Sequence, residues 1–481
     1  MFMHFDCCSN SETIVSRREM LTRVGCGFGA MAFAAMLAQN SMASAILGPD
    51  GRPALVAGGK SAKAKRVIFL YMAGGPSHLD TFDYKPELER ADGKNLSVGR
   101  GNGQLLASPW KFQQGGKSGL WISDLFPNVR NCADDICLLR GMKTAVPAHA
   151  QASVMMHTGS FQFVRPSFGS WVLYGLGSGN ENLPGFITIN PGAGNGGAQN
   201  YGASFLPASV QGTRVDVGRN GNRGGGGGRG QATPDEPIED LRNDRYTRSA
   251  QREQIDFVQA LNKERQRREK DNAIEGLIES YELAFRMQAE VPELIDLTNE
   301  KQSTLEMYGI GTAATDGFGR QCLLARRFAE EGVRFIEVSQ GGWDTHRNLR
   351  TDMERQCGAV DRPIAALLTD LKQRGMLDDT LVIWGGEFGR TPYAQNGDGR
   401  DHNAKGFTIW MAGGGVKGGL SYGSTDPTGG EAIDGVMDIH AWHATALHLM
   451  GLDHSTLTFN HAGRDFRLTD VKGRVVPEIV A

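Results

Sequence analysis

Side chains of the types that bind divalent metals follow several apolar segments of the sequence. His78 and Asp80 come after the first of these segments, and Asp344 and His346 come after the second. Glu387 follows the third segment. Histidine together with carboxylate suits Zn, Mn or Fe, whereas carboxylate oxygens alone would suit Mg or Ca. We therefore predict a site for one or two transition-metal ions, with these candidate ligands: His78, Asp80, Asp344, His346, Glu387, Asp401 and His402.

The spacing within these motifs favours convergence on an ion. In the pairs His78/Asp80 and Asp344/His346, the i,i+2 spacing puts both side chains on one side of an extended backbone. A single Asp or His after a glycine turn more often caps that turn, and carboxylates with histidines also form structural ion networks. Four motifs together favour the metal site. Two ions would neutralise charge, activate an oxygen nucleophile and hold the attacking and leaving oxygens in phosphoryl or sulfuryl hydrolysis.

The sequence also contains a candidate nucleophile and a candidate anion-binding group. His149 and Ser153 are four residues apart, so they are neighbours on one face of a helix, where the histidine could activate the serine. The alternative is that Ser153 only packs or caps, and that His149 is another metal ligand or a substrate contact. Arg390 is the candidate for bidentate binding of an anionic group, with ion pairing to Asp398 or Asp401 as the alternative.

Four apolar segments that end in glycines predict the strands that would position these residues: 66–72, 333–339, 380–384 and 407–411. Helical spacing of apolar residues marks three further segments: 274–307, 318–331 and 353–374. A capped helix is expected over 438–451, with His443 interpreted as a core side chain and a site role as the alternative. Alternating strands and helices imply an α/β fold with a mainly parallel central sheet flanked by helices. Ligands bind beyond the carboxyl ends of strands in such sheets, so we expect the site there.

The first residues predict an export signal. Arg17 and Arg18 precede an apolar run over 24–38, and small residues fit cleavage after Ala45. The run holds about 15 residues, short of the roughly 20 that span a bilayer. We therefore expect a twin-arginine signal over residues 1–45 and no stable membrane span in the mature chain. An uncleaved anchor or a lipoprotein at Cys26 is the alternative.

The export route predicts a periplasmic or secreted protein, with the twin-arginine machinery as its partner in export. This route usually carries proteins already folded around a cofactor, which is a further indication of a metal. After the signal we expect a flexible lead-in over 46–65 and one domain over 66–481. Within it, residues from about 192 to 235 include five consecutive glycines, Gly224 to Gly228, and predict a flexible insert.

Composition limits the classes of partner. With 51 basic and 54 acidic residues the formal net charge is -3, which gives no field that would gather nucleic acid or an anionic membrane. Glycine accounts for 65 of 481 residues, about twice the usual share of roughly 7%. Part of this excess lies at the ends of the four predicted strands, including Gly413 to Gly415, where we expect it to border the site. Four cysteines outside the signal are too few for a disulfide scaffold, and we interpret them as core side chains, with one disulfide as the alternative: Cys132, Cys137, Cys322 and Cys357.

Several of these motifs together resemble the exported domain of unknown function family 1501, over a match from about residue 66 to the C-terminus. The segments that carry the resemblance are Gly74 to Asp83, Gly341 to His346, Gly386 to Pro392, Gly399 to Asn403, His443 to Thr445 and Gly463 to Asp465. The family is similar to the alkaline phosphatase and sulfatase superfamily and is often described as sulfatase-like. The resemblance implies a metal-dependent hydrolase fold, with Asp344 and His346 on one metal. It also implies that Glu387 and His402 stand where the superfamily has an acid and histidines.

The sequence departs from that superfamily at three points. It has no Cys or Ser followed by x-Pro-x-Arg, the run that sulfatases mature to formylglycine. Ala73-Gly74-Gly75 stands where the superfamily has a ligand Asp, so His78 or Asp80 must substitute or that metal is lost. Gly386-Glu387-Phe388-Gly389 replaces the usual Asp-His-Gly.

We therefore expect an exported metal-dependent hydrolase of phosphate or sulfate esters, acting on a small-molecule or polysaccharide ester. The missing nucleophile signature motivates a second hypothesis. In that hypothesis the chain is a non-catalytic cell-envelope or polysaccharide-binding protein that retains the hydrolase fold.

Overall fold

The computed structural model describes residues 62–98, 101–217, 246–269 and 272–481. All of them belong to one compact unit, Ala57–Ala481. The other unit, Met1–Val56, lies outside the described residues, as do the predicted signal and most of the predicted lead-in. Within the described part of the chain, no helix is both long enough and apolar enough to cross a membrane.

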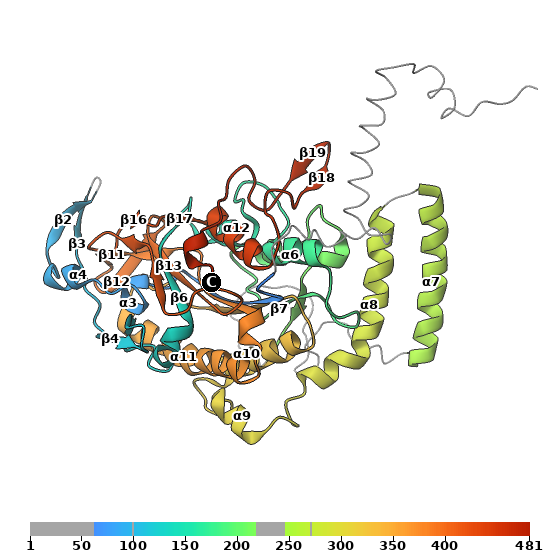
Figure 1. Cartoon of the computed structure of the whole chain (residues 1–481), viewed down its shortest axis with the longest axis horizontal. Coiled ribbons are helices and arrows are strands. Elements are labelled where there is room, and N and C mark those ends of the chain that lie inside the picture. Colours follow the sequence, from blue (N-terminus) through green and yellow to red (C-terminus); the bar gives the residue numbers. More distant parts are fainter. Residues whose placement is uncertain (1–61, 99–100, 218–245, 270–271) are drawn as a thin grey trace, which may run out of the picture. The chain divides into compact units, whose positions relative to one another are not determined.

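A nine-stranded sheet forms the centre of this unit (Figure 1). The strand β1 (Arg66–Ala73) pairs in parallel with β9 (Phe335–Gly341) on one side and with β10 (Thr380–Gly385) on the other. The remaining strands are β6 (Ile136–Lys143), β7 (Phe186–Ile189), β8 (Thr213–Val215), β13 (Phe407–Ala412), β14 (Leu420–Tyr422) and β17 (Met437–Asp438). Their order is β14-β6-β13-β10-β1-β9-β7-β8, with β17 beside β6. The predicted α/β fold with a mainly parallel sheet is confirmed.

The direction of β13 corrects one expectation. The predicted strand at 407–411 is present, but it runs antiparallel to both β10 and β6. Its terminal glycines therefore lie at the opposite edge of the sheet, where a Cβ on Gly414 would come within 2.9 Å of Leu381 at the start of β10. The expectation that Gly413 to Gly415 border the site is wrong, because an apolar run has the same composition in a parallel and in an antiparallel strand.

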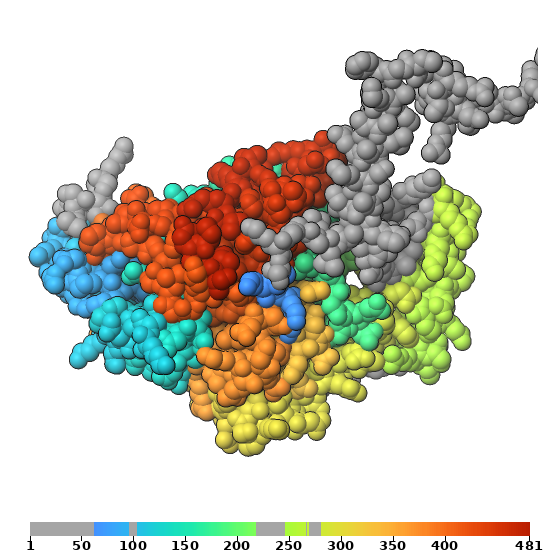
Figure 2. Space-filling model, viewed as in Figure 1, coloured from blue at the N-terminus to red at the C-terminus, as the bar shows by residue number. Residues whose placement is uncertain are grey.

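Helices cover both faces of the sheet. Side chains of β1 alternate between two hydrophobic cores, with Ile68, Leu70 and Met72 in the first and Val67, Phe69 and Tyr71 in the second. The first core is closed by α8 (Asn272–Ile295), α9 (Gln302–Met307), α10 (Asp316–Glu330) and α11 (Leu349–Gln373). The second core is closed by α5 (His149–Thr158), α6 (Phe168–Leu176) and α12 (Ile439–Leu449). In Figure 2, the red region that contains α12 lies above the orange region that contains α10 and α11.

The remaining elements are shorter or lie beside this framework. The helix α7 (Arg248–Glu269) packs against α8, which with α9 replaces the single helix expected over 274–307. Two short helices, α3 (His78–Thr81) and α4 (Pro86–Arg90), follow β1. Five two-stranded sheets are formed by β2 (Asn95–Val98) with β3 (Gly101–Gln104), β4 (Phe112–Gly115) with β5 (Leu120–Ser123), β11 (Gly389–Gln395) with β12 (Gly399–Asn403), β15 (Ser424–Thr425) with β16 (Ala432–Asp434), and β18 (Phe459–His461) with β19 (Arg464–Phe466). The 3-10 helices are η1 (Val129–Asp135), η2 (Gly197–Tyr201), η3 (Ala208–Val210), η4 (Leu377–Asp379) and η5 (Pro477–Ile479).

The first part of the predicted glycine-rich insert carries regular structure. It includes η2 and η3, and β8 extends the central sheet by pairing with β7. Residues 218–245, which contain Gly224 to Gly228, lie outside the described residues.

The cysteines and His443 belong to the core, as interpreted from the sequence. Cys132, Cys137, Cys322 and Cys357 are buried, free thiols. His443 is fully buried in α12, where its Nε2 donates to the carbonyl oxygen of Met156 at 2.8 Å. Burial lowers the pKa of His443 to about 3, so the side chain is neutral at ordinary pH. The predicted cap of this helix is present, since the Asp438 side chain accepts from the N–H of Ala441.

Candidate metal centre

Three loops at the carboxyl edge of the sheet bring four metal-binding side chains together. His149 opens α5, a few residues after the end of β6. Asp344 and His346 lie in the loop between β9 and α11, and His402 lies on β12 in the hairpin that follows β10. One ligand atom from each side chain lies within 4.8 Å of the other three. We call His149, Asp344, His346 and His402 the histidine cluster.

The carboxylate of Asp344 lies at the centre of this cluster. Its Oδ1 is 3.0 Å from the Nε2 of His346, 3.2 Å from the Nε2 of His149 and 3.4 Å from the Nε2 of His402. Gly74, at the end of β1, allows the Asp344 loop to come this close: it has a φ of 118°, and a Cβ there would be 2.7 Å from the Asp344 nitrogen. The Asp344 side chain is 45% exposed, so a bound ion would be reachable from solvent.

The outer nitrogens of the three histidines all face hydrogen-bond acceptors. The Nδ1 of His346 is 2.5 Å from Gln395 Oε1, and the Nδ1 of His402 is 2.6 Å from the carbonyl oxygen of Pro147. The Nδ1 of His149 is 2.6 Å from Glu387 Oε1. Each Nδ1 must therefore carry a proton and donate it, because none of these three partners offers one.

This arrangement leaves the inner nitrogens of His346 and His402 without a proton to share. An imidazole that carries its one proton at Nδ1 has a lone pair on Nε2. The Nε2 atoms of His346 and His402 nevertheless lie 2.9 Å apart, and the Nε2 of His149 lies on the same carboxylate, 3.2 Å from Asp344 Oδ1. Lone pairs facing one another beside a carboxylate are stabilised by a cation, and the outer hydrogen bonds are those that orient histidine ligands in metal sites. The residues present thus fit a transition-metal ion with three nitrogen ligands and one oxygen ligand.

The carboxylates in and beside the histidine cluster favour a positive charge among its side chains. Burial lowers the pKa of His149, but the carboxylates of Asp344 and Glu387 outweigh it and raise the pKa to about 9. Burial likewise raises the pKa of Asp344, but contacts from His149, His402 and Arg390 outweigh it and hold the pKa well below its usual range. In the metal-free protein the two carboxylates therefore retain a proton on His149, which a metal ion would displace.

Arg390 contacts the cluster from the interior of the protein and is not available to an external anion. Its guanidinium is fully buried and donates to Asp344 Oδ1 at 2.6 Å. It also donates to the carbonyl oxygens of Gly75 and Arg400, at 2.9 and 3.1 Å. Its ion-pair partner is thus Asp344, not the Asp398 or Asp401 considered from the sequence. The structure places Arg390 as a residue that positions Asp344.

Two of the predicted ligands lie next to the cluster without joining it. Glu387 is fully buried behind His149, and its two carboxylate oxygens also accept from the N–H of Gly74 at 3.0 and 3.2 Å. Asp401 is 56% exposed, and its Oδ1 accepts from the N–H of His402 at 2.8 Å and lies 3.9 Å from His346 Nδ1. The structure thus makes Glu387 a residue that orients His149.

The structure does not bring the predicted pair His78 and Asp80 to the cluster. The extended backbone expected there is wrong, because both residues lie in α3 and are buried. Both carboxylate oxygens of Asp80 accept from the fully buried Arg400, at 2.7 and 3.1 Å, and the Nε2 of His78 lies 2.9 Å from the Gly429 carbonyl oxygen. Asp80 is therefore neutralised by an arginine from its own chain.

Ser153 is buried on the same face of α5 as His149, as the spacing predicts, but the two side chains have different partners. The Ser153 hydroxyl hydrogen-bonds to the hydroxyl of Tyr71, which donates in turn to Glu387 Oε2 at 3.0 Å. Burial and the Glu387 charge raise the pKa of Tyr71 well above its ordinary value, so this hydroxyl keeps its proton. His149 is turned toward Asp344 and Glu387 and does not activate Ser153 in this arrangement.

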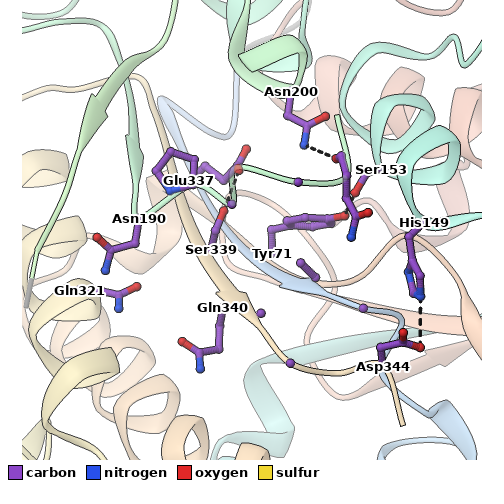
Figure 3. Close-up of a pocket in the computed structure, with 18 of the residues that line it drawn as sticks. Tyr71, His149, Ser153, Asn190, Asn200, Gln321, Glu337, Ser339, Gln340 and Asp344 are labelled. Atoms are coloured by element: carbon purple, nitrogen blue, oxygen red, sulfur yellow. Dashed lines mark hydrogen bonds and ion pairs between the residues drawn. The ribbon is translucent and has the colours of Figure 1, made fainter. Parts of the chain in front are cut away.

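A cavity of about 430 Å³ adjoins the cluster (Figure 3). Its wall begins at His149 and Asp344 and continues along Tyr71, Ser153 and Glu337. It is therefore bounded by the carboxyl ends of β1 and β9, where the sequence analysis expected a site.

Some of the residues of this site were not identified from the sequence. Tyr71 and Glu337 each interrupt an apolar strand, and a charged side chain in a buried strand is a signal that could have singled out Glu337. Gln395 and the carbonyl of Pro147 carried no such signal, because only the folded hairpin and loop place them behind His346 and His402.

The fold and the site define an α/β protein with a candidate metal centre at the carboxyl edge of its sheet. Residues 64–480 match the family described as "Protein of unknown function (DUF1501)", and the chain belongs to that family. This confirms the resemblance stated from the motifs. Comparison with curated proteins gives no match.

Solved structures similar to this chain include sulfatases and phosphatases. The lipoteichoic acid synthase LtaP from Listeria monocytogenes has a TM-score of 0.37 and 9% identity, over 86% of this chain and 76% of that one. The PsFucS1 sulfatase from Pseudoalteromonas sp. has a TM-score of 0.33 and 11% identity, over 82% and 68%. The alkaline phosphatase from the Antarctic bacterium TAB5 has a TM-score of 0.29 and 11% identity, over 75% and 94%. All three TM-scores lie below 0.5.

Proposed function

We propose that the protein is an exported, metal-dependent hydrolase of phosphate or sulfate esters, and that the histidine cluster holds one transition-metal ion. The observation that carries the proposal is the convergence of three imidazole nitrogens on the Asp344 carboxylate, with every outer nitrogen already bonded to an acceptor. The cluster also lies at the rim of a cavity that can receive a substrate.

The ligand set favours Zn, Mn or Fe over Mg or Ca, because three of the four ligand atoms are imidazole nitrogens. Such an ion supplies Lewis-acid stabilisation of a developing negative charge and a strong nucleophile at neutral pH. The protein contributes the orientation. Arg390 fixes the Asp344 carboxylate, and Glu387 and Gln395 hold the rings of His149 and His346 with their Nε2 atoms directed inward.

The surroundings of Asp80 favour one ion over two. A second ion in the position expected from the sequence would need His78 or Asp80 as a ligand. Asp80 is held by Arg400 through both oxygens, and its Oδ2 also accepts from the hydroxyl of Ser77 at 2.5 Å. An ion there would have to displace a fully buried guanidinium.

Water is the nucleophile that this geometry favours. Ser153 is the predicted protein nucleophile, but its hydroxyl donates to Tyr71, because the Tyr71 proton is directed at Glu387. No described residue removes the Ser153 proton directly. We expect the variant Ser153→Ala to retain a substantial part of any ester hydrolysis, whereas a nucleophilic serine would be indispensable.

The test is hydrolysis of an aryl phosphate and an aryl sulfate by the purified protein, before and after chelation and with Zn²⁺, Mn²⁺ or Fe²⁺ added back. His402→Ala should remove the metal-dependent activity. Asp401→Asn is the matched control, because Asp401 is the neighbouring residue and lies outside the cluster. A metal-free protein that is inert toward both esters would contradict the proposal, and a metal-loaded but inert protein would favour the non-catalytic alternative. Export is tested separately, by replacing Arg17 and Arg18 with lysine and locating the protein.

A further inference from the structure

The cavity beside the histidine cluster is lined by groups that hydrogen-bond without net positive charge. Besides the Glu337 and Asp344 carboxylates and His149, the polar lining consists of amides and hydroxyls, and no lysine or arginine is among the described residues that line it. The neutral polar side chains are those of Tyr71, Ser153, Asn190, Asn195, Asn200, Gln321, Ser339 and Gln340. An anionic group has no charged partner in this cavity apart from the cluster itself.

Two buried acceptors in the lining lack a hydrogen-bond donor. They are Asn200 Oδ1 and Gln321 Oε1. Their residues are only 9% and 6% exposed. The Asn200 amide is oriented by its own Nδ2, which donates to the Asn195 carbonyl oxygen at 3.1 Å and leaves Oδ1 free. An unsatisfied buried acceptor costs about 1–3 kcal/mol, so these atoms call for a ligand or water that donates hydrogen bonds.

Glu337, the buried carboxylate of the cavity, does not need a bound cation to balance its charge. Glu337 Oε2 lies 3.2 Å from the buried Nε2 of His157, and Glu337 Oε1 accepts from Ser339 at 3.0 Å. The coulombic attraction of Glu337 raises the pKa of His157 against the burial that lowers it. The pair therefore balances its charge within the chain. The lining is suited to a neutral ligand.

The size of the cavity and its glycine-lined wall fit a hydroxyl-rich ring. A volume of about 430 Å³ lies within the range of roughly 300–1,000 Å³ that is usual for small-molecule sites. Five glycines line the wall and keep it free of side chains at these positions: Gly74, Gly192, Gly194, Gly341 and Gly342. Figure 3 shows Asn200, Gln321 and Glu337 distributed around the cavity, with His149 and Asp344 at one end.

We propose that this cavity is a subsite for an uncharged sugar residue. Sugar hydroxyls donate to the free acceptors of Asn200 and Gln321, and accept from the amide side chains of the lining. The charged ester of the same substrate is directed to the histidine cluster at the end of the cavity. This assignment rests on the proposed function for the fate of the ester, but sugar binding by the cavity does not require turnover.

The experiment is saturation-transfer difference NMR with the methyl glycosides of neutral hexoses and the full-length protein. Wild type should show transfer to at least one glycoside, and His402→Ala should show it equally, because that variant removes the metal centre and leaves the cavity. Asn200→Leu and Gln321→Met should weaken binding by about tenfold or more, the loss expected for about 1.4 kcal/mol. Gln302→Met, at an exposed glutamine of α9, is the matched control and should bind as wild type does.

A folded wild type that shows no transfer to any neutral hexoside overturns the assignment, even when ester hydrolysis is observed. Equal binding by wild type, Asn200→Leu and Gln321→Met also overturns it, since the sugar then binds elsewhere. If the two buried substitutions prevent folding, Gln340→Met decides the matter, because this lining residue is only half-buried. Transfer without ester hydrolysis would retain the sugar subsite and reject the proposed hydrolase.

Discussion

The histidine cluster and the buried pair of Asp80 with Arg400 are built from residues of the same types, placed after strands of the same sheet. In the pair, Arg400 occupies both oxygens of Asp80, and both side chains are 0% exposed. In the cluster, Arg390 contacts Asp344 as well, but three imidazoles face the same carboxylate and the aspartate is 45% exposed. One carboxylate is neutralised within the chain, and the other has room for an ion.

This difference shows what distinguishes a ligand from a structural ion pair. Residue type and position after a strand do not distinguish the two. His78 and Asp80 have ligand-type side chains and follow a strand, but they lie away from the cluster. The distinguishing feature is the number of lone pairs left over once every partner inside the chain is counted. In the cluster the outer acceptors fix a proton on each Nδ1, so that all three Nε2 atoms face Asp344, and the second proton of His149 would be displaced by a metal ion.

The largest difference should appear when the central carboxylate of the cluster is neutralised. Asp344→Asn removes the only anionic ligand and weakens metal binding by more than about 100-fold, the upper end of the loss expected for an outer partner. Metal titration of the chelated protein measures the effect, and hydrolysis of the aryl esters should disappear with the metal. A variant that retains metal and activity would show that Asp344 is not a ligand.

The corresponding change in the buried pair should affect folding and leave metal binding intact. Arg400→Met leaves Asp80 charged and without its arginine in the interior, which lowers the free energy of unfolding by about 3–5 kcal/mol. Urea denaturation measures this loss, and the double variant Asp80→Leu/Arg400→Met should recover part of it. If Arg400→Met instead changes the metal stoichiometry at unchanged stability, the comparison fails, because Asp80 would then belong to a metal site.

A smaller effect is expected from the carboxylate that orients His149. Glu387→Gln keeps a hydrogen-bond acceptor at this position but removes the charge, and should weaken metal binding by about 10–100-fold. Asp401→Asn changes an exposed carboxylate and should leave the affinity within a few-fold of wild type. Equal losses for the two variants would mean that the general negative charge of the region, rather than the orientation of His149, controls affinity.

Over a single pH unit, the change in metal affinity should be the smallest of these effects. Although burial opposes it, Asp344 and Glu387 hold the pKa of His149 at about 9 in the metal-free protein. The protonated form therefore predominates below pH 9, and an ion must displace that proton. Affinity should rise by up to about tenfold per pH unit between pH 7 and 9 and then level off. Calorimetry in two buffers with different ionisation enthalpies should show release of about one proton at pH 7, and no release would contradict this charge state.

The sequence was sufficient for the architecture and for part of the site. Apolar runs that end in glycine identified β1, β9 and β10, and the rule that ligands bind beyond strand ends led to Asp344, His346 and His402. In the proposed metal centre His149 takes the ligand role that the sequence left as its alternative, and Glu387 orients His149 instead of binding the ion. Spacing along the chain cannot separate these roles, because they depend on which ring nitrogen faces the other loops.

The fate of His78 and Asp80 could not be inferred for the same reason. Arg400 is separated from Asp80 by 320 positions and meets it only because the hairpin of β11 and β12 folds back over α3. The direction of β13 could not be inferred either, because the sequence of a strand that is buried on both faces does not indicate its orientation. The Asp80–Arg400 contact and the direction of β13 both depend on tertiary structure.

The most direct test of the metal centre is a crystal structure of the purified protein with anomalous scattering recorded at the Zn, Mn and Fe absorption edges. We expect one ion, bound by the Nε2 atoms of His149, His346 and His402 and by Asp344, at about 2.0–2.2 Å. We expect no ion beside Asp80, where Arg400 should be found as described. An ion bound by His78 or Asp80, or a histidine cluster that binds none of the three metals when each is supplied, would contradict the account.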